Sequence, residues 1–168
     1  MRTCSRRSMD RTLACGAGNI GSIPIESTTM EEDKYAANIV KEYRYWTVYV
    51  NEDQGFLGRC VVWCRREDAL DLALSTPEEQ KELFDILPAV RSALAQSFGA
   101  TWFNYSFLGN VDRHLHCHLF PRYQSPVSFN GTVFTDLNYN ENPSKTGTTN
   151  KVSKEMLGAI RATLAKVL

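Results

Sequence analysis

All three histidines of the chain fall within five residues, and their spacing constrains the local fold. Residues 114–120 read HLHCHLF, so His114, His116 and His118 alternate with apolar residues. Because side chains alternate between the two faces of a β-strand, we predict a strand with an imidazole face and an apolar face. Two residues of strand advance roughly 7 Å, which is the expected spacing of successive imidazoles. The residues predicted to face the core are Leu115, Cys117 and Leu119.

Histidines in this pattern are compatible with three roles. They can be surface residues without a function, but chance alternation of all the histidines in one strand is improbable. They can bind Zn²⁺, although no further cluster of Cys, Asp or Glu supplies the remaining ligands. They can also act on a phosphate chain, because a neutral imidazole is nucleophilic and exchanges protons near pH 7. We favour this third role and keep the metal site as an alternative.

The composition excludes several classes of protein. The 168 residues carry 19 basic and 19 acidic groups and are 43% hydrophobic, as expected for one folded domain that does not depend on nucleic acid binding. No apolar run is long enough for a membrane helix. Cys60 and Cys64, four residues apart in a predicted strand, would lie about 13 Å apart, too far for a disulfide. We therefore expect reduced thiols and a cytoplasmic protein.

Residues 1–29 differ from the rest of the chain. They are rich in Arg, Ser, Thr and Gly and lack any helical or strand period, so we expect a disordered leader. The stretch Gly21-Ser22-Ile23-Pro24 can be encoded by GGTTCGATTCC, which resembles the T-arm of a transfer RNA gene. The alternative is therefore that translation starts at Met30. In either case, residues 30–168 are predicted to form a single domain.

Periodicity and turn residues predict an α+β domain. Thr76, Pro77 and Glu79 form a helix start with a capping box, and Gly99 is the expected end of that helix. Residues 121–151 are predicted to be a long loop. Trp46, Trp63 and Trp102 are expected in the core or at an interface. Helices are predicted at 31–41, 77–98 and 156–167, and strands at 44–50, 58–64, 100–107 and 113–120. Their order implies an antiparallel sheet with helices packed on it.

The segment HLHCHLF resembles the His-x-His-x-His-x-x signature of the histidine triad (HIT) superfamily of nucleotide hydrolases and transferases. The resemblance extends to Leu108–Val111, to Pro121–Tyr123, and to Val50-Asn51 followed by Gly58. It is strongest for the branch related to diadenosine polyphosphate hydrolases. The resemblance implies a HIT-like antiparallel sheet of about five strands with packed helices.

The resemblance also implies roles for single residues. His116 would attack the α-phosphorus and form a covalent nucleotidyl-imidazole, which water would then release. His114 would orient the pair, and His118 would help the leaving group depart. Asn51 matches a ribose-binding position and Asn104 a phosphate-contacting amide, although the residues alone suggest a turn and a strand-edge amide.

Further positions of interest flank the triad strand. Gly109 and Asn110 match the small polar stretch before the triad, while Val111 stands where the family often has a hydroxyl side chain. Arg122 follows Pro121 at the exit of the strand, where it can grip distal phosphates or be a solvated loop residue. Both interpretations of Arg122 remain open.

These features predict a nucleotide hydrolase acting on a phosphoanhydride or phosphoramidate, such as a diadenosine polyphosphate. A histidine at position 118 favours hydrolysis, because transferase branches often have glutamine there. A nucleotidyltransferase or phosphorylase, and a non-catalytic nucleotide-binding module, remain alternatives. We expect no metal in the attack, with Mg²⁺ as an optional companion of the substrate. The expected assembly is a homodimer, with no membrane and no stable nucleic acid partner.

Overall fold

The computed structural model describes residues 35–143 and 151–168. The predicted leader, residues 1–29, and the alternative start at Met30 lie outside the described residues. No helix within the two described ranges is long and apolar enough to cross a membrane.

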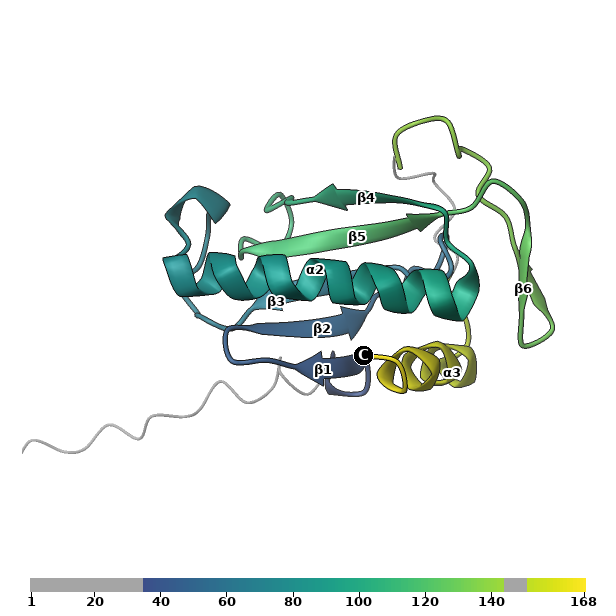
Figure 1. The fold of residues 1–168 in the computed structure, drawn as a ribbon, viewed down its shortest axis with the longest axis horizontal. Coiled ribbons are helices and arrows are strands. Elements are labelled where there is room, and N and C mark those ends of the chain that lie inside the picture. Colours follow the sequence, from purple (N-terminus) through teal and green to yellow (C-terminus); the bar gives the residue numbers. More distant parts are fainter. Residues whose placement is uncertain (1–34, 144–150) are drawn as a thin grey trace, which may run out of the picture.

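A five-stranded antiparallel sheet forms the centre of the molecule, which confirms the predicted α+β class (Figure 1). The strands are β1 (Ile39–Glu42), β2 (Trp46–Val50), β3 (Cys60–Cys64), β4 (Trp102–Ser106) and β5 (His116–Arg122). Their spatial order is β1-β2-β3-β5-β4, so β3 and β5 are neighbours although more than fifty residues separate them in the sequence. The triad strand therefore lies inside the sheet, paired on both sides.

Two helices cover the sheet. Helix α2 (Pro77–Phe98) crosses one face, and α3 (Lys154–Ala165) packs near β1 and β2 (Figure 1). The predicted capping box of α2 is present: the Thr76 hydroxyl accepts from the Glu79 amide, and the Glu79 carboxylate accepts from the Thr76 amide. Gly99, with φ of 73°, ends the helix as expected. A short 3₁₀ helix, η1 (Leu72–Leu74), precedes α2.

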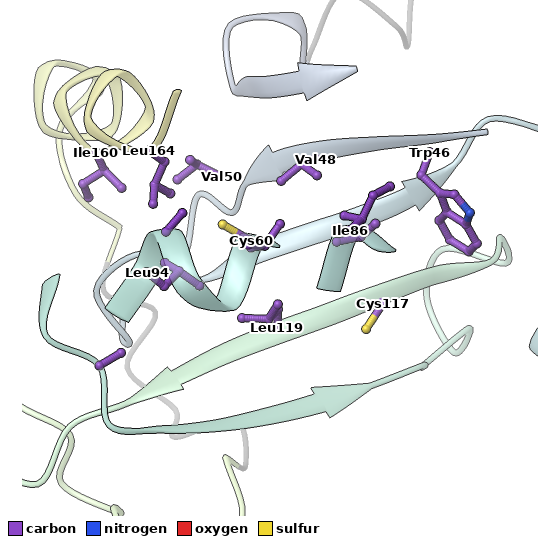
Figure 2. Packing of buried hydrophobic residues seen from close by; sticks show 14 of the residues in the cluster. Trp46, Val48, Val50, Cys60, Ile86, Leu94, Cys117, Leu119, Ile160 and Leu164 are labelled. Atoms are coloured by element: carbon purple, nitrogen blue, oxygen red, sulfur yellow. The ribbon is translucent and has the colours of Figure 1, made fainter. Parts of the chain in front are cut away.

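The core lies between the sheet and α2, with α3 closing one end (Figure 2). Alternate residues of β2, β3 and β5 point toward it, and the predicted core residues Leu115, Cys117 and Leu119 are all buried. The residues that fill this space include Val48, Val50, Cys60, Val62, Cys117 and Leu119 from the sheet, Ile86, Val90 and Leu94 from α2, and Ile160 and Leu164 from α3.

The helix predicted over residues 31–41 is wrong in its second half: residues 35–36 are helical, but residues 39–42 form β1. The Ile39 position pairs with Tyr49, and Lys41 and Glu42 pair with Val48 and Thr47. Pairing with β2 supplies the backbone hydrogen bonds that a helix would have made within the segment. The local pattern was read as a helix because a neighbouring strand cannot be seen in it.

The predicted loop over residues 121–151 contains a hairpin. Strands β6 (Val127–Phe129) and β7 (Thr132–Phe134) pair antiparallel around Asn130 and Gly131. Both turn residues have positive φ, 46° and 77°. Asn-Gly between apolar residues is a strong hairpin signal, and it was overlooked in a region rich in polar residues.

Gly58, just before β3, is required by its backbone and by its neighbours. Its φ is +82°, and a Cβ added there would lie 2.6 Å from Leu94 Cδ2 and 2.9 Å from the Phe98 ring. We predict that Gly58→Ala lowers the free energy of unfolding by about 2–4 kcal/mol, combining left-handed strain with overpacking. Urea unfolding measures this loss.

Gly131→Ala is the matched control, because Gly131 has a φ of +77° and no heavy atom within 4 Å of the added Cβ. It should lose only the backbone component, about 1–2 kcal/mol. Equal losses for the two variants would contradict the close approach of α2 to Gly58.

Candidate active site

The histidines lie on the face of the sheet opposite α2. Antiparallel pairing places Trp63 beside His116 and Val61 beside His118. The apolar residues between the histidines face the core, so the predicted alternation is confirmed. Strand β5 begins at His116, and His114 lies two residues before it, outside the strand.

A hydrogen bond to the backbone sets the tautomer of His116. Its Nδ1 lies 2.7 Å from the carbonyl oxygen of His114. A carbonyl only accepts hydrogen bonds, so Nδ1 carries the proton and Nε2 presents a lone pair. The Nε2 of His118 lies 3.1 Å away and is the donor to this lone pair. The His116 and His118 rings turn toward each other, and their centroids are 4.7 Å apart. This is shorter than the roughly 7 Å expected from the advance of two residues along a strand.

His114 is held by the loop that follows β3. Its Nε2 lies 3.1 Å from the carbonyl oxygen of Arg66, and the Arg66 side chain binds Glu79 in the first turn of α2. The amide of Leu115 donates to the carbonyl of Ala69 in the same loop. The N-terminus of α2 therefore anchors the segment that positions His114.

Two ring nitrogens of this cluster have no partner. The Nδ1 atoms of His114 and His118 are buried and make no hydrogen bond. In both rings, the bonding described above places the proton on Nε2, which leaves each Nδ1 as an acceptor. A buried acceptor without a donor is unfavourable, and such atoms are candidates for contact with a ligand.

Burial keeps two of the imidazoles neutral. Desolvation lowers the pKa of His118 to about 4, and the positive potentials of His116 and Arg59 add to this effect. Desolvation also lowers the pKa of His114. Near pH 7, His114 and His118 are therefore neutral, and His118 donates through the proton that its tautomer holds.

Trp63 belongs to this site, whereas we predicted a core or interface residue. Its ring stacks on His114, with centroids 4.5 Å apart and planes 4° apart, and on His116, at 4.9 Å and 15°. Each stacked contact restricts the rotation of one imidazole ring. No local pattern identified Trp63, because its position depends on the register between β3 and β5. Of the other two, Trp46 is buried in the core as expected, and Trp102 is exposed on the edge strand β4.

Two cavities open on or near this face. The first, of about 260 Å³, contacts His114 and His116, and the second, of about 510 Å³, lies over the end of β4. Gly109, a predicted site residue, lines the first cavity, whereas Asn104 and Arg122 line the second. The first cavity is lined by Leu70–Leu72, Phe107–Gly109 and His114–His116, and the second by Trp102, Asn104, Arg122 and Tyr139–Asn142.

The predicted amides do not contact the histidines. The Asn51 side-chain oxygen accepts from the Asp53 amide at 2.8 Å, which is the turn role that its sequence context suggested. The Asn104 side-chain oxygen accepts from Arg122 at 2.9 Å. Asn110 is exposed in the loop before the triad, next to Gly109. Of these candidates, Gly109 is the residue that shares a cavity with the triad.

Arg122 is neither a solvated residue nor available to a phosphate in this arrangement. Its Nε and Nη2 bind the Asp136 carboxylate, and both side chains are buried. Its remaining donors reach Asn104 Oδ1 and the carbonyls of Asn138 and Glu141. A guanidinium has five N–H groups, and these contacts use all of them. Arg122 therefore ties the segment 136–141 to the sheet.

The architecture agrees with solved structures of histidine triad proteins. A histidine triad protein from Sinorhizobium meliloti is 19% identical, covers 81% of this chain and 94% of its own, and has a TM-score of 0.66. One from Marinobacter aquaeolei is 20% identical, with 81% and 93% covered and the same TM-score. No family model and no curated protein matches the chain.

The chain has the histidine triad fold. A third structure with this fold, a zinc-bound family protein from Mycobacterium smegmatis, is 18% identical, covers 76% of this chain and 84% of its own, and has a TM-score of 0.52. Within residues 35–143 and 151–168 of this chain, no group of three His, Cys, Asp or Glu side chains is arranged to hold a metal.

The buried histidine triad predicts an unusual titration. We expect the His118 ring to stay neutral from pH 8 down to about pH 4, because burial and neighbouring positive charge lower its pKa to about 4. Between an ordinary pKa of about 6.5 and that value, the unfolded chain binds more protons, so His118 reduces stability as the pH falls. Nuclear magnetic resonance of labelled imidazoles measures the midpoint. A midpoint near 6.5 would contradict the buried placement.

Proposed function

We propose that this chain is a nucleotide hydrolase that cleaves a phosphoanhydride or phosphoramidate at the α-phosphorus of an adenine nucleotide or dinucleotide. The observation that carries the proposal is the fixed tautomer of His116, whose Nδ1 proton is bound by the His114 carbonyl 2.7 Å away. This bond directs the Nε2 lone pair toward the neighbouring His118. A nucleophilic imidazole with its proton held on the far nitrogen is ready to attack phosphorus.

The reaction has two steps. Nε2 of His116 forms a bond to the α-phosphorus as the bond from phosphorus to the leaving group breaks. In the adduct, Nδ1–H still donates its hydrogen bond to the His114 carbonyl, which stabilises the positive charge on the imidazole. Water then attacks the same phosphorus as the bond from phosphorus to Nε2 breaks; the electron pair of that bond returns to His116, the proton lost by the water passes to solvent, and the nucleoside monophosphate is released.

His118 supplies a hydrogen bond in both steps. Its Nε2–H points at His116 Nε2, 3.1 Å away. When a phosphoryl group is bound to Nε2 of His116, that nitrogen no longer accepts a hydrogen bond. The Nε2–H of His118 then donates to a phosphate oxygen or to the bridging oxygen. Because His118 is neutral near pH 7, it enters the reaction as a donor without carrying a charge.

The deciding experiment compares the wild type with His116→Ala on diadenosine tetraphosphate and on an adenosine phosphoramidate. We expect the wild type to release AMP and the variant to lose the activity by at least about 1,000-fold, because the nucleophile is absent. Chromatography identifies the products. The variant should still bind AMP, which confirms that the site remains folded.

Two other outcomes would favour other functions. If excess inorganic phosphate changes the product from AMP to ADP, phosphate resolves the adduct and the protein is a phosphorylase. If both proteins bind AMP and neither consumes a substrate, the site is a nucleotide-binding module. A cytoplasmic location and independence from metal in the attack stay predictions.

We also infer a homodimer that forms through β4. This strand is at the edge of the sheet, and its Trp102 and Tyr105 side chains are exposed. An edge strand with exposed aromatic residues is suited to pairing with a second copy. Sedimentation equilibrium should give twice the mass of the chain, and Trp102→Lys should shift the mass toward the monomer. A wild type that is monomeric at high micromolar concentration would exclude the dimer.

A further inference from the structure

Arg59 is a second arginine on the face of the sheet that carries the histidines. Its carbonyl accepts from the Asn51 amide, and the next residue, Cys60, pairs with Leu119 of β5. Arg59 therefore stands beside Phe120, with its guanidinium 4.7 Å from the centre of that ring. The Phe120 ring in turn lies 5.9 Å from the His118 ring. Along this face, the order is His116, His118, then Phe120 with Arg59.

The guanidinium of Arg59 is poorly satisfied. Its Nη1 donates to Asp53 at 2.9 Å, and its Nε is buried without any partner. The side chain is 17% exposed, so solvent reaches part of the guanidinium but not its Nε. A half-buried cation with an unpaired Nε–H costs free energy that a bound anion would recover. Arg122 is the opposite case, because protein acceptors occupy all of its donors.

The charge of Arg59 also reaches the triad. Its positive potential contributes, after burial and His116, to the lowered pKa of His118. An arginine stays charged even where burial lowers its pKa, as it does here. The site therefore holds a permanent positive charge on the side of His118 that is remote from the nucleophile.

We propose that Arg59 binds the phosphate chain of the leaving group, and that this contact selects substrates with an anionic leaving group. The proposal rests on the proposed function, in which His116 attacks the α-phosphorus and His118 donates to the bridging oxygen. The group beyond that oxygen then lies toward Phe120 and Arg59. The free Nε–H and Nη donors form a planar fork that suits a phosphate. The leaving group departs as a nucleoside polyphosphate, and Arg59 takes no proton.

The test compares Arg59→Gln on two substrates that share the same α-phosphorus. We expect kcat/KM for diadenosine tetraphosphate to fall about 10- to 100-fold, the range for losing a hydrogen bond to a charged group. The rate with adenosine phosphoramidate should stay near the wild-type value, because its leaving group carries no phosphate. Arg59→Lys should retain part of the activity on the tetraphosphate, since it keeps the charge but loses the fork.

Two variants serve as controls. Arg65→Gln removes an exposed arginine that pairs with Glu42, and both rates should be unchanged. Asp53→Asn removes the carboxylate that binds Arg59 and should strengthen inhibition by inorganic pyrophosphate. Asp53→Asn also tests the proposal independently if Arg59→Gln fails to fold, which circular dichroism would reveal.

The outcomes separate this proposal from the proposed function. Equal losses on both substrates, or no loss on the tetraphosphate, would overturn the role of Arg59 while hydrolysis through His116 stands. A wild type that hydrolyses neither substrate would overturn the proposed function. In that case, calorimetry with pyrophosphate tests the role of Arg59 separately. Binding to the wild type that is lost in Arg59→Gln supports an anion site at Arg59, and equal binding to both proteins excludes one.

Discussion

The antiparallel pairing of β3 with β5 is the interaction on which the rest of the structure depends. It joins segments that lie far apart in the sequence and places β5 inside the sheet. On one face, the pairing completes the apolar surface that α2 covers (Figure 2). On the other face, it sets Trp63 against the imidazoles and Arg59 beside Phe120. A slip of one residue would exchange the two faces, so the core and the site depend on the same register.

The site combines neutral histidines with a permanent positive charge. Burial lowers the pKa of His114 and His118, while the backbone carbonyl of His114 determines which nitrogen of His116 holds its proton. Two arginines on this face, the half-buried Arg59 and the buried Arg122, differ in their partners. The N–H groups of Arg122 bind acceptors that include Asp136 and the Glu141 carbonyl. The Nε–H of Arg59 has no hydrogen-bond partner. The exposed fraction of an arginine therefore does not show whether it has a structural role. The number of its five N–H groups that already have protein acceptors is more informative.

Predictions from the sequence succeeded where local chemistry decides the structure. The capping box of α2 and its glycine end follow from residues within one helical turn. The same local reasoning missed β1, because its strand conformation comes from pairing with β2. The Asn130-Gly131 pair is a local signal for the β6–β7 hairpin, although the segment was predicted to be a loop. For Asn51 and Asn104, the plain interpretations as turn and strand residues describe their hydrogen bonds.

The sequence by itself determined that His116 and His118 share one face of a strand, because successive side chains of a strand point to opposite faces. It also determined the α+β class through the order of its elements. The tertiary structure alone decided how closely the imidazoles approach, which tryptophan touches them, and which arginine keeps free donors. These features depend on the register between strands that are remote in sequence and on burial, and neither is encoded in any short segment of the chain.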